Sequence, residues 1–403
     1  MFGWELPPYN SGGLGTASLG MTEGLANLGV DIDFILPKAH GPYPYRHMRI
    51  HSASGEDAHS LEANNLPYGN YMSQDEHGNS QISYATNQSS DAYMQASWYA
   101  KTTLPLVQQT AFEVIHTHDW MTYRSGIQAR SNARRAGITA PLVAHIHATE
   151  FDRGGSSGGN PNIGAIEHTG LNAADRVIAV SHYTARMVHE KYGVSKSKIS
   201  VVHNGIMPGI PPTYDLEALK KHFKIVLFMG RITMSKGPEY FLKLAKSVTD
   251  KDPQVKFVMV GSGDMEQECI ELAAKMGLTG KILFSSFLRG EDVNRAYQLA
   301  DLFVMPSVSE PFGLVALEAL QNGTPAIVSK QSGVAEVSKH LVQIDFWETK
   351  KMSASVLRIL HNPAYATRLC QGGYADLRRL SWVKAAEKIQ NIYQELLPLP
   401  AYA

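Results

Sequence analysis

Short apolar runs alternate with amphipathic segments along nearly the whole chain, and this alternation is the feature that most constrains the fold. Ten runs have the length and composition of buried strands: VDIDFILP, FEVIHTH, PLVAHIH, RVIAVS and ISVVHNG in the first half, then KIVLFMG, VKFVMVG, KILFSSF, DLFVMP and PAIVS. Strands separated by helices pair in parallel, with helices on both faces of the sheet. The sequence therefore predicts an α/β fold with two doubly wound parallel sheets.

Length and loop composition predict two domains. A chain of 403 residues exceeds what one core usually serves, since cores stop growing at roughly 250–300 residues. Gly and Pro concentrate between the two sets of strands, in NGIMPGIPPTYD, which has no periodicity. We therefore place a linker near residues 205–215, between a domain at 1–206 and a second domain at 213–382.

Composition excludes several classes of partner. The 37 basic and 37 acidic residues cancel, which argues against recruitment of duplex nucleic acid or anionic membrane by a strong overall field. The only cysteines, Cys269 and Cys370, suggest neither a disulfide scaffold nor a cysteine metal site. No apolar run approaches the roughly 20 residues of a membrane span, and the N-terminus lacks a signal-peptide pattern. We expect a cytoplasmic protein without a transmembrane segment.

A glycine-rich loop stands near the N-terminus, in PPYNSGGLG. Gly12, Gly13 and Gly15 lie ahead of a predicted helix, where small residues let backbone N–H groups approach an anion. A phosphate is the expected guest, although a glycine turn that merely connects strand to helix fits the pattern equally. Only MFGW precedes this loop, so the first strand is nearly missing and the chain looks truncated or late-starting.

Two cations directly follow a strand in FMGRITMSKGPEYFLKLAK. Arg231 and Lys236 lie ahead of a predicted helix, and the carboxyl end of a parallel strand faces the usual ligand crevice. Arginine can grip phosphate oxygens in a fork while lysine acts as a point charge. The pair is thus suited to neutralise a diphosphate leaving group without a metal. A solvated loop with incidental charges is the alternative.

Two glutamates, Glu310 and Glu318, stand in the apolar stretch SEPFGLVALEALQNG. Residues 311–313 should start a helix that stops at 322–323. Eight residues then separate the two carboxylates by about 12 Å along the helix axis, which suits opposite ends of an elongated ligand. The free N–H groups of residues 312–315 would face phosphates or sugar hydroxyls. Alternatively, one acid complements the helix dipole and the other is a surface residue.

Histidines end two neighbouring strands, in VIHTHDW and HIHATEFDR. Strand alternation points His116 and His118 the same way, and an H-x-H pair of this kind is also found in zinc hydrolases. No dedicated carboxylate–histidine set accompanies them, so we favour polar residues that line a sugar pocket and expect no metal.

Together, the motifs GGLG, HTHDW, GRITMSKG and SEPFGLVALEALQNGTPAIVS resemble those of retaining glycosyltransferases of family 4. The resemblance implies the GT-B fold shared by glycogen, starch and sucrose-phosphate synthases, with two Rossmann-like domains and a cleft between them. It also implies that the linker is a hinge and that the last helix, at 383–397, packs back on the N-terminal domain. The spacing of Glu310 and Glu318 is similar to the E-x7-E pattern of that family.

The resemblance also implies roles for individual residues. His147 would lie near the reacting carbon, Glu310 would contact the transferred sugar, and Arg231 with Lys236 would hold the diphosphate. Glu318 would bind the ribose. The remaining donor contacts implied are Gly12, Gly13 and Leu14 over the phosphates, Asp119 near a sugar, Leu288 of SSFLRG at the nucleobase, and the backbone of Phe312, Gly313, Leu314 and Val315.

The GGLG form resembles the glycogen and starch synthase branch, which implies UDP- or ADP-glucose as donor, no cofactor, and a glucan acceptor. Transfer would retain the anomeric configuration through front-face attack. The chain departs from that branch at Asn10 and Ser11, where a lysine is usual, and at Thr16, where an acid is usual. Another acceptor (cell-surface polysaccharide, lipid or small molecule), a nucleotide-sugar epimerase and a binding protein therefore stay open as alternatives.

Overall fold

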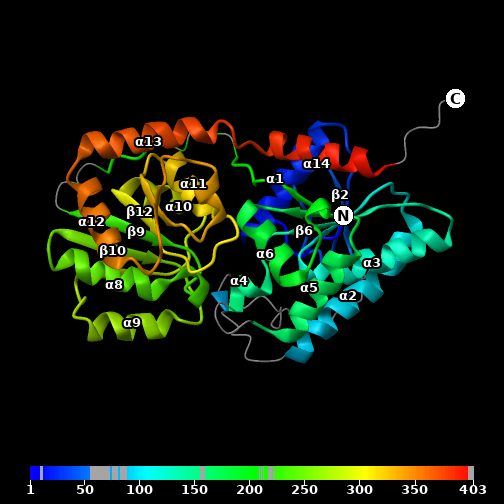
Figure 1. Ribbon diagram of the computed structural model, residues 1–403, viewed down its shortest axis with the longest axis horizontal. Coiled ribbons are helices and arrows are strands. Elements are labelled where there is room, and N and C mark those ends of the chain that lie inside the picture. Colours follow the sequence, from blue (N-terminus) through cyan, green and yellow to red (C-terminus); the bar gives the residue numbers. More distant parts are fainter. Residues whose placement is uncertain are drawn as a thin grey trace. The chain divides into compact units, whose positions relative to one another are not determined.

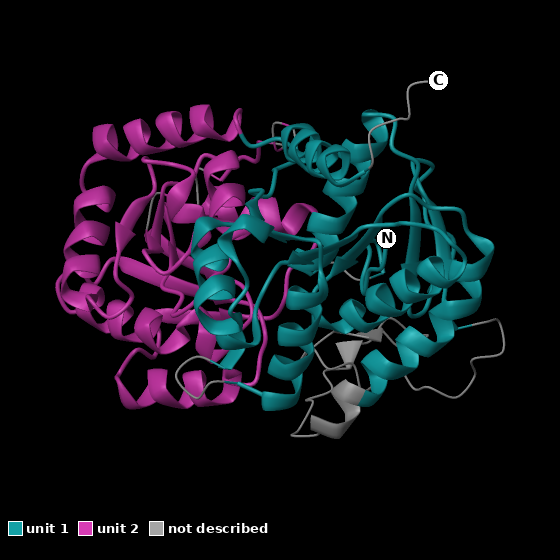
Figure 2. Ribbon diagram, turned by 45° about the vertical axis from the view of Figure 1, so that its right-hand side comes forward, with its two compact units in different colours: residues 1–207, 380–403 teal, residues 208–379 magenta. Residues whose placement is uncertain are grey.

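The computed structural model describes residues 1–9, 12–54, 73–74, 80–81, 89–154, 159–207, 209, 211, 213–216, 220 and 223–397. The chain divides into two compact units: unit 1 comprises residues 1–207 and 380–403, and unit 2 comprises residues 208–379 (Figure 2). Residues 380–382, which the sequence prediction assigned to the second domain, thus lie in unit 1. Several residues of the predicted linker, and Asn10 with Ser11, lie outside the described residues.

Unit 1 contains the elements of the first part of the chain and the last helix (Figure 1). Its described helices are α1 (Gly13–Asn27), α2 (Ser89–Gln109), α3 (Trp120–Arg135), α4 (Glu150–Gly154), α5 (Pro161–Ala173), α6 (His182–Tyr192) and α14 (Trp382–Leu396). Its described strands are β1 (Asp33–Leu36), β2 (Arg49–Ser52), β3 (Ser73–Gln74), β4 (Ser80–Gln81), β5 (Ile115–His118), β6 (Leu142–Ile146), β7 (Arg176–Ala179) and β8 (Ile199–Val201).

In unit 1, one residue near the N-terminus joins two sets of parallel strands. Strands β5, β6, β7 and β8 pair in parallel in that order, and β1 pairs in parallel with β2. Phe2 forms parallel bridges to both Ile35 of β1 and Thr117 of β5, and its N–H donates to the His116 carbonyl oxygen at 2.8 Å. The first strand is therefore a single bridged residue, and the strand order reverses there.

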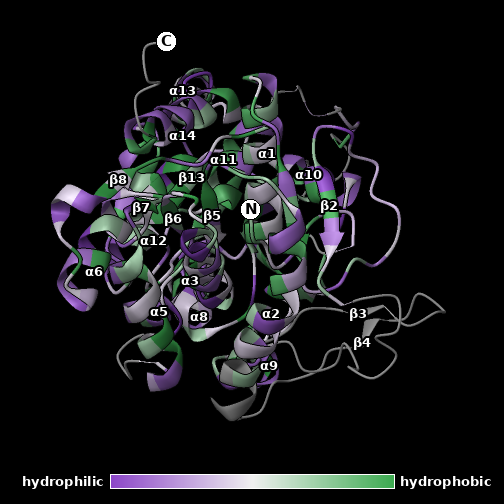
Figure 3. Ribbon diagram, turned by 90° about the vertical axis from the view of Figure 1, so that its right-hand side faces the viewer, coloured by the Kyte–Doolittle hydropathy of each residue, from purple (hydrophilic) through white to green (hydrophobic). Residues whose placement is uncertain are grey.

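Strand alternation sends side chains of this sheet into two separate cores. Ile115, Leu142 and Ala144 belong to the core that includes residues of α3, α5 and α6, whereas Val143 and Ile178 belong to the core that includes residues of α1 and α14. Figure 3 shows the short β2 mostly in hydrophilic purple. Histidines 116, 118 and 145 alternate with the first set, so they lie on the α1 and α14 face.

Helices α1 and α14 pack closely because α1 carries two glycines at the contact. A Cβ at Gly20 would lie 2.3 Å from the Trp382 ring, and one at Gly24 would lie 2.7 Å from the Trp382 carbonyl oxygen. Any larger residue would push α14 away from the sheet. The last helix therefore covers the face of unit 1 on which the histidines lie.

Unit 2 contains one sheet of six parallel strands (Figure 1). The strands are β9 (Lys224–Met229), β10 (Val255–Val260), β11 (Ile282–Ser285), β12 (Leu302–Met305), β13 (Ala326–Ser329) and β14 (Val342–Ile344), in the order β11-β10-β9-β12-β13-β14. Its described α-helices are α8 (Pro238–Thr249), α9 (Glu266–Lys275), α10 (Glu291–Leu299), α11 (Leu314–Gln321), α12 (Thr349–Leu360) and α13 (Pro363–Leu377).

The strand order of unit 2 reverses between β9 and β12, so the loops that follow these two strands leave the same edge of the sheet in opposite directions. In open α/β sheets such a reversal creates the ligand crevice. Val226, Phe228 and Val304 pack with residues of α8 and α12, while Phe303 packs against Tyr297 of α10. The predicted fold class, two doubly wound parallel sheets, is confirmed. Within the described part of the chain, no helix combines the length and apolarity needed to cross a membrane.

Candidate active site

In unit 2, the loops after β9 and β12 are bonded to each other. The N–H groups of Val308 and Ser309 donate to the Ser235 carbonyl oxygen at 2.8 and 3.3 Å. Gly237 ends the first loop with φ +68°, and a Cβ there would lie 2.1 Å from the Pro306 carbonyl oxygen. Only glycine fits this left-handed, closely approached position. The backbone thus fixes Arg231 and Lys236 on one loop against Glu310 on the other.

Lys236 and Glu310 form an ion pair. The Lys236 Nζ lies 2.5 Å from Glu310 Oε2, and the Ser307 hydroxyl lies 3.4 Å from the same oxygen. The Glu310 side chain is 8% exposed and that of Lys236 is 21% exposed, so the pair is shielded from water but reachable. Arg231 is exposed and has no ion-pair partner among the described residues. One cation is therefore held by a carboxylate, and one is free to meet an anion.

Helix α11 presents unpaired N–H groups beside this ion pair. Gly313 is its N-cap with φ +108°, and no acceptor among the described residues bonds the N–H groups of Gly313, Leu314 or Val315. The Val334 N–H donates to the Phe312 carbonyl oxygen at 2.7 Å, which fixes the approach to the helix. These N–H groups carry the positive end of the helix dipole.

The separation of about 12 Å between Glu310 and Glu318 predicted from the sequence assumed that one helix contains both residues, and this assumption is wrong. The rise of about 1.5 Å per residue applies only within a helix, and α11 begins at Leu314 because the left-handed Gly313 interrupts it. Glu310 instead forms a parallel bridge with Ser332. Its position is set by the loop that follows β13, which sequence spacing alone does not reveal.

Glu318 is half-buried on α11 and accepts a hydrogen bond from the Tyr297 hydroxyl of α10 at 3.0 Å. Burial raises the pKa of Glu318, and the bond from Tyr297 acts in the opposite direction. An ordinary surface glutamate would show neither feature. Tyr297, which orients this carboxylate, was missed from the sequence, where it reads only as an apolar position of a helix.

Leu288 lies in the loop between β11 and α10 and is half-buried. Because all six strands are parallel, this loop leaves the same edge of the sheet as the loops that carry Arg231 and Glu310. No described contact of Leu288 bears on its expected place at a nucleobase, which stays a prediction.

In unit 1, the glycine loop leads into α1, but a carboxylate already lies at the start of this helix. Glu5 is buried, and its Oε1 accepts the Gly15 N–H at 2.7 Å. A Cβ at Gly12, the N-cap of α1, would lie 2.7 Å from the same oxygen. The N–H groups of Gly13 and Leu14 have no acceptor among the described residues. The glycines therefore admit Glu5, a residue that sequence reasoning missed, and any phosphate there would meet its negative charge.

Asp119 follows β5 and holds the end of β6. It is the only non-glycine described with positive φ, +57°, a conformation that costs roughly 1–2 kcal/mol. Its buried Oδ1 accepts the N–H groups of His147 at 2.6 Å and Ala148 at 3.4 Å. Arg153 lies 3.9 Å from Oδ2. These contacts stabilise the strained backbone and make Asp119 a residue that positions His147.

His147 itself is half-buried and belongs to a cluster of four histidines. Its Nε2 lies 3.0 Å from His118 Nδ1, and His116 Nε2 lies 3.3 Å from His145 Nδ1. Burial lowers the pKa of all four imidazoles, most strongly for His116, His118 and His145. At neutral pH the imidazole of His147 is therefore a neutral hydrogen-bonding group.

A buried ionic network fixes the segment after His147. Arg153 Nη1 lies 3.1 Å from Glu150 and 3.2 Å from Glu167, and its Nη2 donates to the Ala148 carbonyl oxygen at 3.0 Å. The Tyr192 hydroxyl donates to Glu167. Burial raises the pKa of Glu167 to about 7, while Arg153 acts to lower it. Sequence reasoning missed this network because its members come from α4, α5 and α6.

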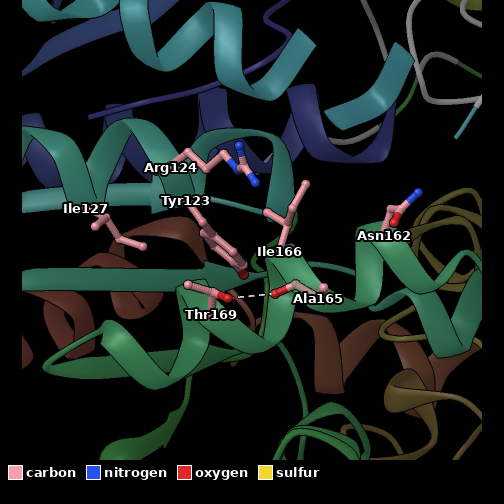
Figure 4. Close-up of a pocket in the computed structure, with 7 residues that line it drawn as sticks. All are labelled: Tyr123, Arg124, Ile127, Asn162, Ala165, Ile166 and Thr169. Carbon is pink, nitrogen blue, oxygen red and sulfur yellow. Dashed lines mark hydrogen bonds between the residues drawn. The ribbon is translucent and has the colours of Figure 1, made fainter. Parts of the chain in front are cut away.

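A separate cavity of about 140 Å³ lies between α3 and α5 and contains none of the predicted site residues (Figure 4). Figure 4 shows Tyr123 and Arg124 of α3 facing Ile166 and Thr169 of α5. The Thr169 hydroxyl donates to the Ala165 carbonyl oxygen within the same helix. The cavity has no charged side chain other than Arg124 and adds nothing to the sites at the strand ends.

Known proteins resemble this chain over most of its length. A model described as Glycosyltransferase Family 4 matches residues 11–208, and one described as Glycosyl transferases group 1 matches residues 216–376. An uncharacterized glycosyltransferase of Methanocaldococcus jannaschii is 29% identical over 414 residues, covering 98% of this chain and 97% of that protein. A D-inositol 3-phosphate glycosyltransferase of a Nocardioides species is 26% identical over 312 residues, which cover 70% of this chain and 67% of that protein.

Among solved structures, sucrose-phosphate synthase from Thermosynechococcus elongatus matches with a TM-score of 0.76 at 20% identity, over 98% of each chain. The two family models divide the chain at the boundary between the two units, and each model covers one parallel sheet. The chain is therefore a glycosyltransferase of the GT-B type, with a family 4 domain in unit 1 and a group 1 domain in unit 2.

Proposed function

We propose that this glycosyltransferase moves a hexosyl group, specifically glucosyl, from a nucleoside-diphosphate sugar to a hydroxyl acceptor with retention of configuration. UDP- and ADP-glucose are the proposed donors. The diphosphate binds at the reversal of strand order in unit 2, and the reaction needs no cofactor.

The observation that carries this proposal is the grouping of positive charge at the ends of β9 and β12. Arg231 is exposed without a described ion-pair partner, Lys236 is held by one carboxylate, and α11 begins with three unpaired N–H groups. A diphosphate offers enough acceptor oxygens for all of them. A neutral sugar or a single carboxylate would leave most of these donors without partners.

The proposed reaction develops negative charge on the leaving diphosphate, and the site stabilises that charge. As the bond between the anomeric carbon and the diphosphate oxygen breaks, negative charge grows on the leaving diphosphate, and Arg231, Lys236 and the α11 amides stabilise it. Glu310 is freed when Lys236 turns to the phosphate, and it accepts hydrogen bonds from sugar hydroxyls. Glu318, oriented by Tyr297, accepts bonds from the ribose. The acceptor hydroxyl attacks the same face and passes its proton to the leaving phosphate, which keeps the configuration.

In unit 1, His147 is the residue proposed to contact the transferred sugar. Its backbone is held by Asp119 and its ring by His118. A neutral imidazole donates or accepts a hydrogen bond without adding a charge that would repel an electron-poor anomeric carbon. Positioning of this kind contributes to catalysis by holding the reactants in a reactive geometry.

Two acceptor classes follow from different observations. The GGLG motif favours a glucan, as in glycogen and starch synthases. The relative named D-inositol 3-phosphate glycosyltransferase favours a small phosphorylated polyol instead. A glucan is the first candidate, and product mapping on maltooligosaccharides and on inositol 3-phosphate separates the two.

Lys236→Ala tests the proposed function, with Lys243→Ala as the matched control. Lys243 is exposed on α8 just after the loop, where it pairs with Glu239 of the same helix at 3.5 Å and lies over the Tyr240 ring. Transfer from UDP- or ADP-glucose is expected to fall about 100- to 1,000-fold in Lys236→Ala and to stay unchanged in Lys243→Ala. Normal turnover by Lys236→Ala would contradict the diphosphate role. Release of an epimer instead of a glycoside would identify an epimerase.

A further inference from the structure

The buried histidine cluster of unit 1 contains more ligand atoms than its hydrogen bonds use. His116 and His118 lie on β5, and the parallel register sets His118 beside His145 of β6. One ring nitrogen from each of His116, His118 and His145 lies within 4.8 Å of one from each of the others. The sequence alone disfavours zinc because no dedicated carboxylate–histidine set accompanies the H-x-H pair, whereas the register places a third histidine beside it.

Two buried nitrogens of this cluster have no partner. His118 and His145 are 0% and 3% exposed, and the Nε2 atom of each lacks a hydrogen bond among the described residues. An unsatisfied polar atom in a buried site costs roughly 1–3 kcal/mol, so native proteins seldom keep two side by side without a reason. A ligand that accepts electron pairs removes part of that cost.

The distances suit a tetrahedral transition-metal ion. Two imidazole nitrogens, each 2.0–2.1 Å from zinc at a tetrahedral angle, are about 3.4 Å apart. His116 Nε2 and His145 Nδ1 are 3.3 Å apart, which is long for a hydrogen bond between neutral rings but close to this value. One ring nitrogen of His118 lies within 4.8 Å of one from each of these two histidines and makes a set of three.

The partners of two of the other ring nitrogens also fit, whereas His145 Nε2 has none among the described residues. A histidine that binds a metal through one nitrogen usually donates a hydrogen bond through the other. His116 Nδ1 contacts the Tyr393 hydroxyl of α14, and His118 Nδ1 contacts His147 Nε2 at 3.0 Å. An ion here would join β5, β6 and α14, and it would fix the ring that orients His147.

We propose that His116, His118 and His145 form a binding site for a divalent transition-metal ion, with zinc as the best match. The ion is structural: it lies behind His147, on the α1 and α14 face of the sheet, and it forms or breaks no covalent bond of the substrate. This site is separate from the diphosphate site proposed in unit 2 and stands without it.

The test uses zinc alone on the full chain. Protein stripped with a chelator, reloaded with zinc and desalted is expected to retain one zinc per chain by elemental analysis, and its Tm is expected to rise with zinc concentration. His145→Gln is expected to retain at least tenfold less zinc, while His168→Gln, which changes an exposed histidine of α5, retains as much as the wild type.

Wild-type protein that retains no zinc and shows no change in Tm would overturn the proposal. Equal zinc loss in both variants, or none in His145→Gln, would overturn it as well, because the ion would then bind elsewhere. If His145→Gln does not fold, as judged by circular dichroism, the wild-type zinc content and Tm shift decide. If the wild-type protein binds zinc as expected but transfers no sugar, the proposed function is contradicted and the zinc site is not.

Discussion

The two units share one strand order but differ in how their helix N-termini are paired. In both, strand order reverses at a central strand, and a helix begins in a loop at that reversal. In unit 1 the buried Glu5 carboxylate already accepts an N–H of α1. In unit 2 the first N–H groups of α11 have no described acceptor, and two cations stand on the neighbouring loop. The same fold thus offers an anion site in unit 2, whereas in unit 1 a buried carboxylate already lies at the start of the helix.

A glycine loop before a helix is therefore not by itself a phosphate site. Glycine allows close approach of whatever lies opposite, and at Gly12 that is Glu5. The charge of the surrounding side chains decides what binds. Four substitutions test this difference between the two units.

Gly237→Ala is expected to have the largest effect, with Gly193→Ala as its control. Both glycines have φ +68°, but a Cβ at Gly237 would lie 2.1 Å from a backbone oxygen while one at Gly193 meets nothing within 4 Å. We expect a loss of more than about 3 kcal/mol at Gly237, by clash and strain together, and about 1 kcal/mol at Gly193. Urea unfolding measures both. Equal losses would show that the two loops of unit 2 are not held as described.

Glu167→Gln tests the buried charges of unit 1. The pKa of Glu167 is raised from 4.5 to about 7, so the folded protein binds this proton more tightly than the unfolded chain. Its contribution to stability is full below pH 4.5 and is lost as pH rises to about 7, by about 3 kcal/mol. Glu167→Gln should remove this fall in the free energy of unfolding, whereas the exposed Glu190→Gln should keep it. An unchanged slope in Glu167→Gln would contradict the assignment.

Arg231→Ala tests the free cation of unit 2. Loss of a forked, charge-assisted contact is expected to weaken binding of UDP or ADP about 10- to 100-fold, and Arg231→Lys should restore only part because lysine lacks the fork. Isothermal titration measures the affinity. Full recovery in Arg231→Lys would indicate a simple point charge, and no loss in Arg231→Ala would remove Arg231 from the site.

Glu5→Gln is expected to have the smallest effect. Removing the charge at the start of α1 should lower the free energy of unfolding by about 1 kcal/mol and leave the affinity for UDP or ADP unchanged. The same titration and unfolding measurements apply. A change in nucleotide affinity as large as that of Arg231→Ala would erase the distinction between the two helix N-termini.

Much of the fold could be predicted from the sequence because buried parallel strands are continuous apolar runs. All ten predicted strands are present, whereas β2, β3, β4 and β14 were missed because RIHS, the two SQ pairs and VQI are short and contain polar residues. The first strand could not be recognised in MFGW, since Phe2 is the one residue of this segment that forms β-bridges.

The candidate site was predictable only as a set of motifs. Their positions at strand ends follow from the alternation of elements, but their partners do not. Lys236 meets Glu310 because two loops bond through Ser235, and Asp119 meets the His147 backbone across neighbouring strands. The error over the spacing of Glu310 and Glu318 has the same origin, since one left-handed glycine shortened the helix. Such contacts depend on register and on single backbone angles.

The proposed reaction depends above all on where the nucleoside diphosphate binds. Isothermal titration of UDP and ADP into the wild type, Lys236→Ala and the surface control Lys243→Ala measures this. We predict at least tenfold weaker binding in Lys236→Ala, about 1.4 kcal/mol, and wild-type binding in Lys243→Ala. Equal affinity for all three proteins would contradict the placement of the diphosphate at the reversal of strand order in unit 2.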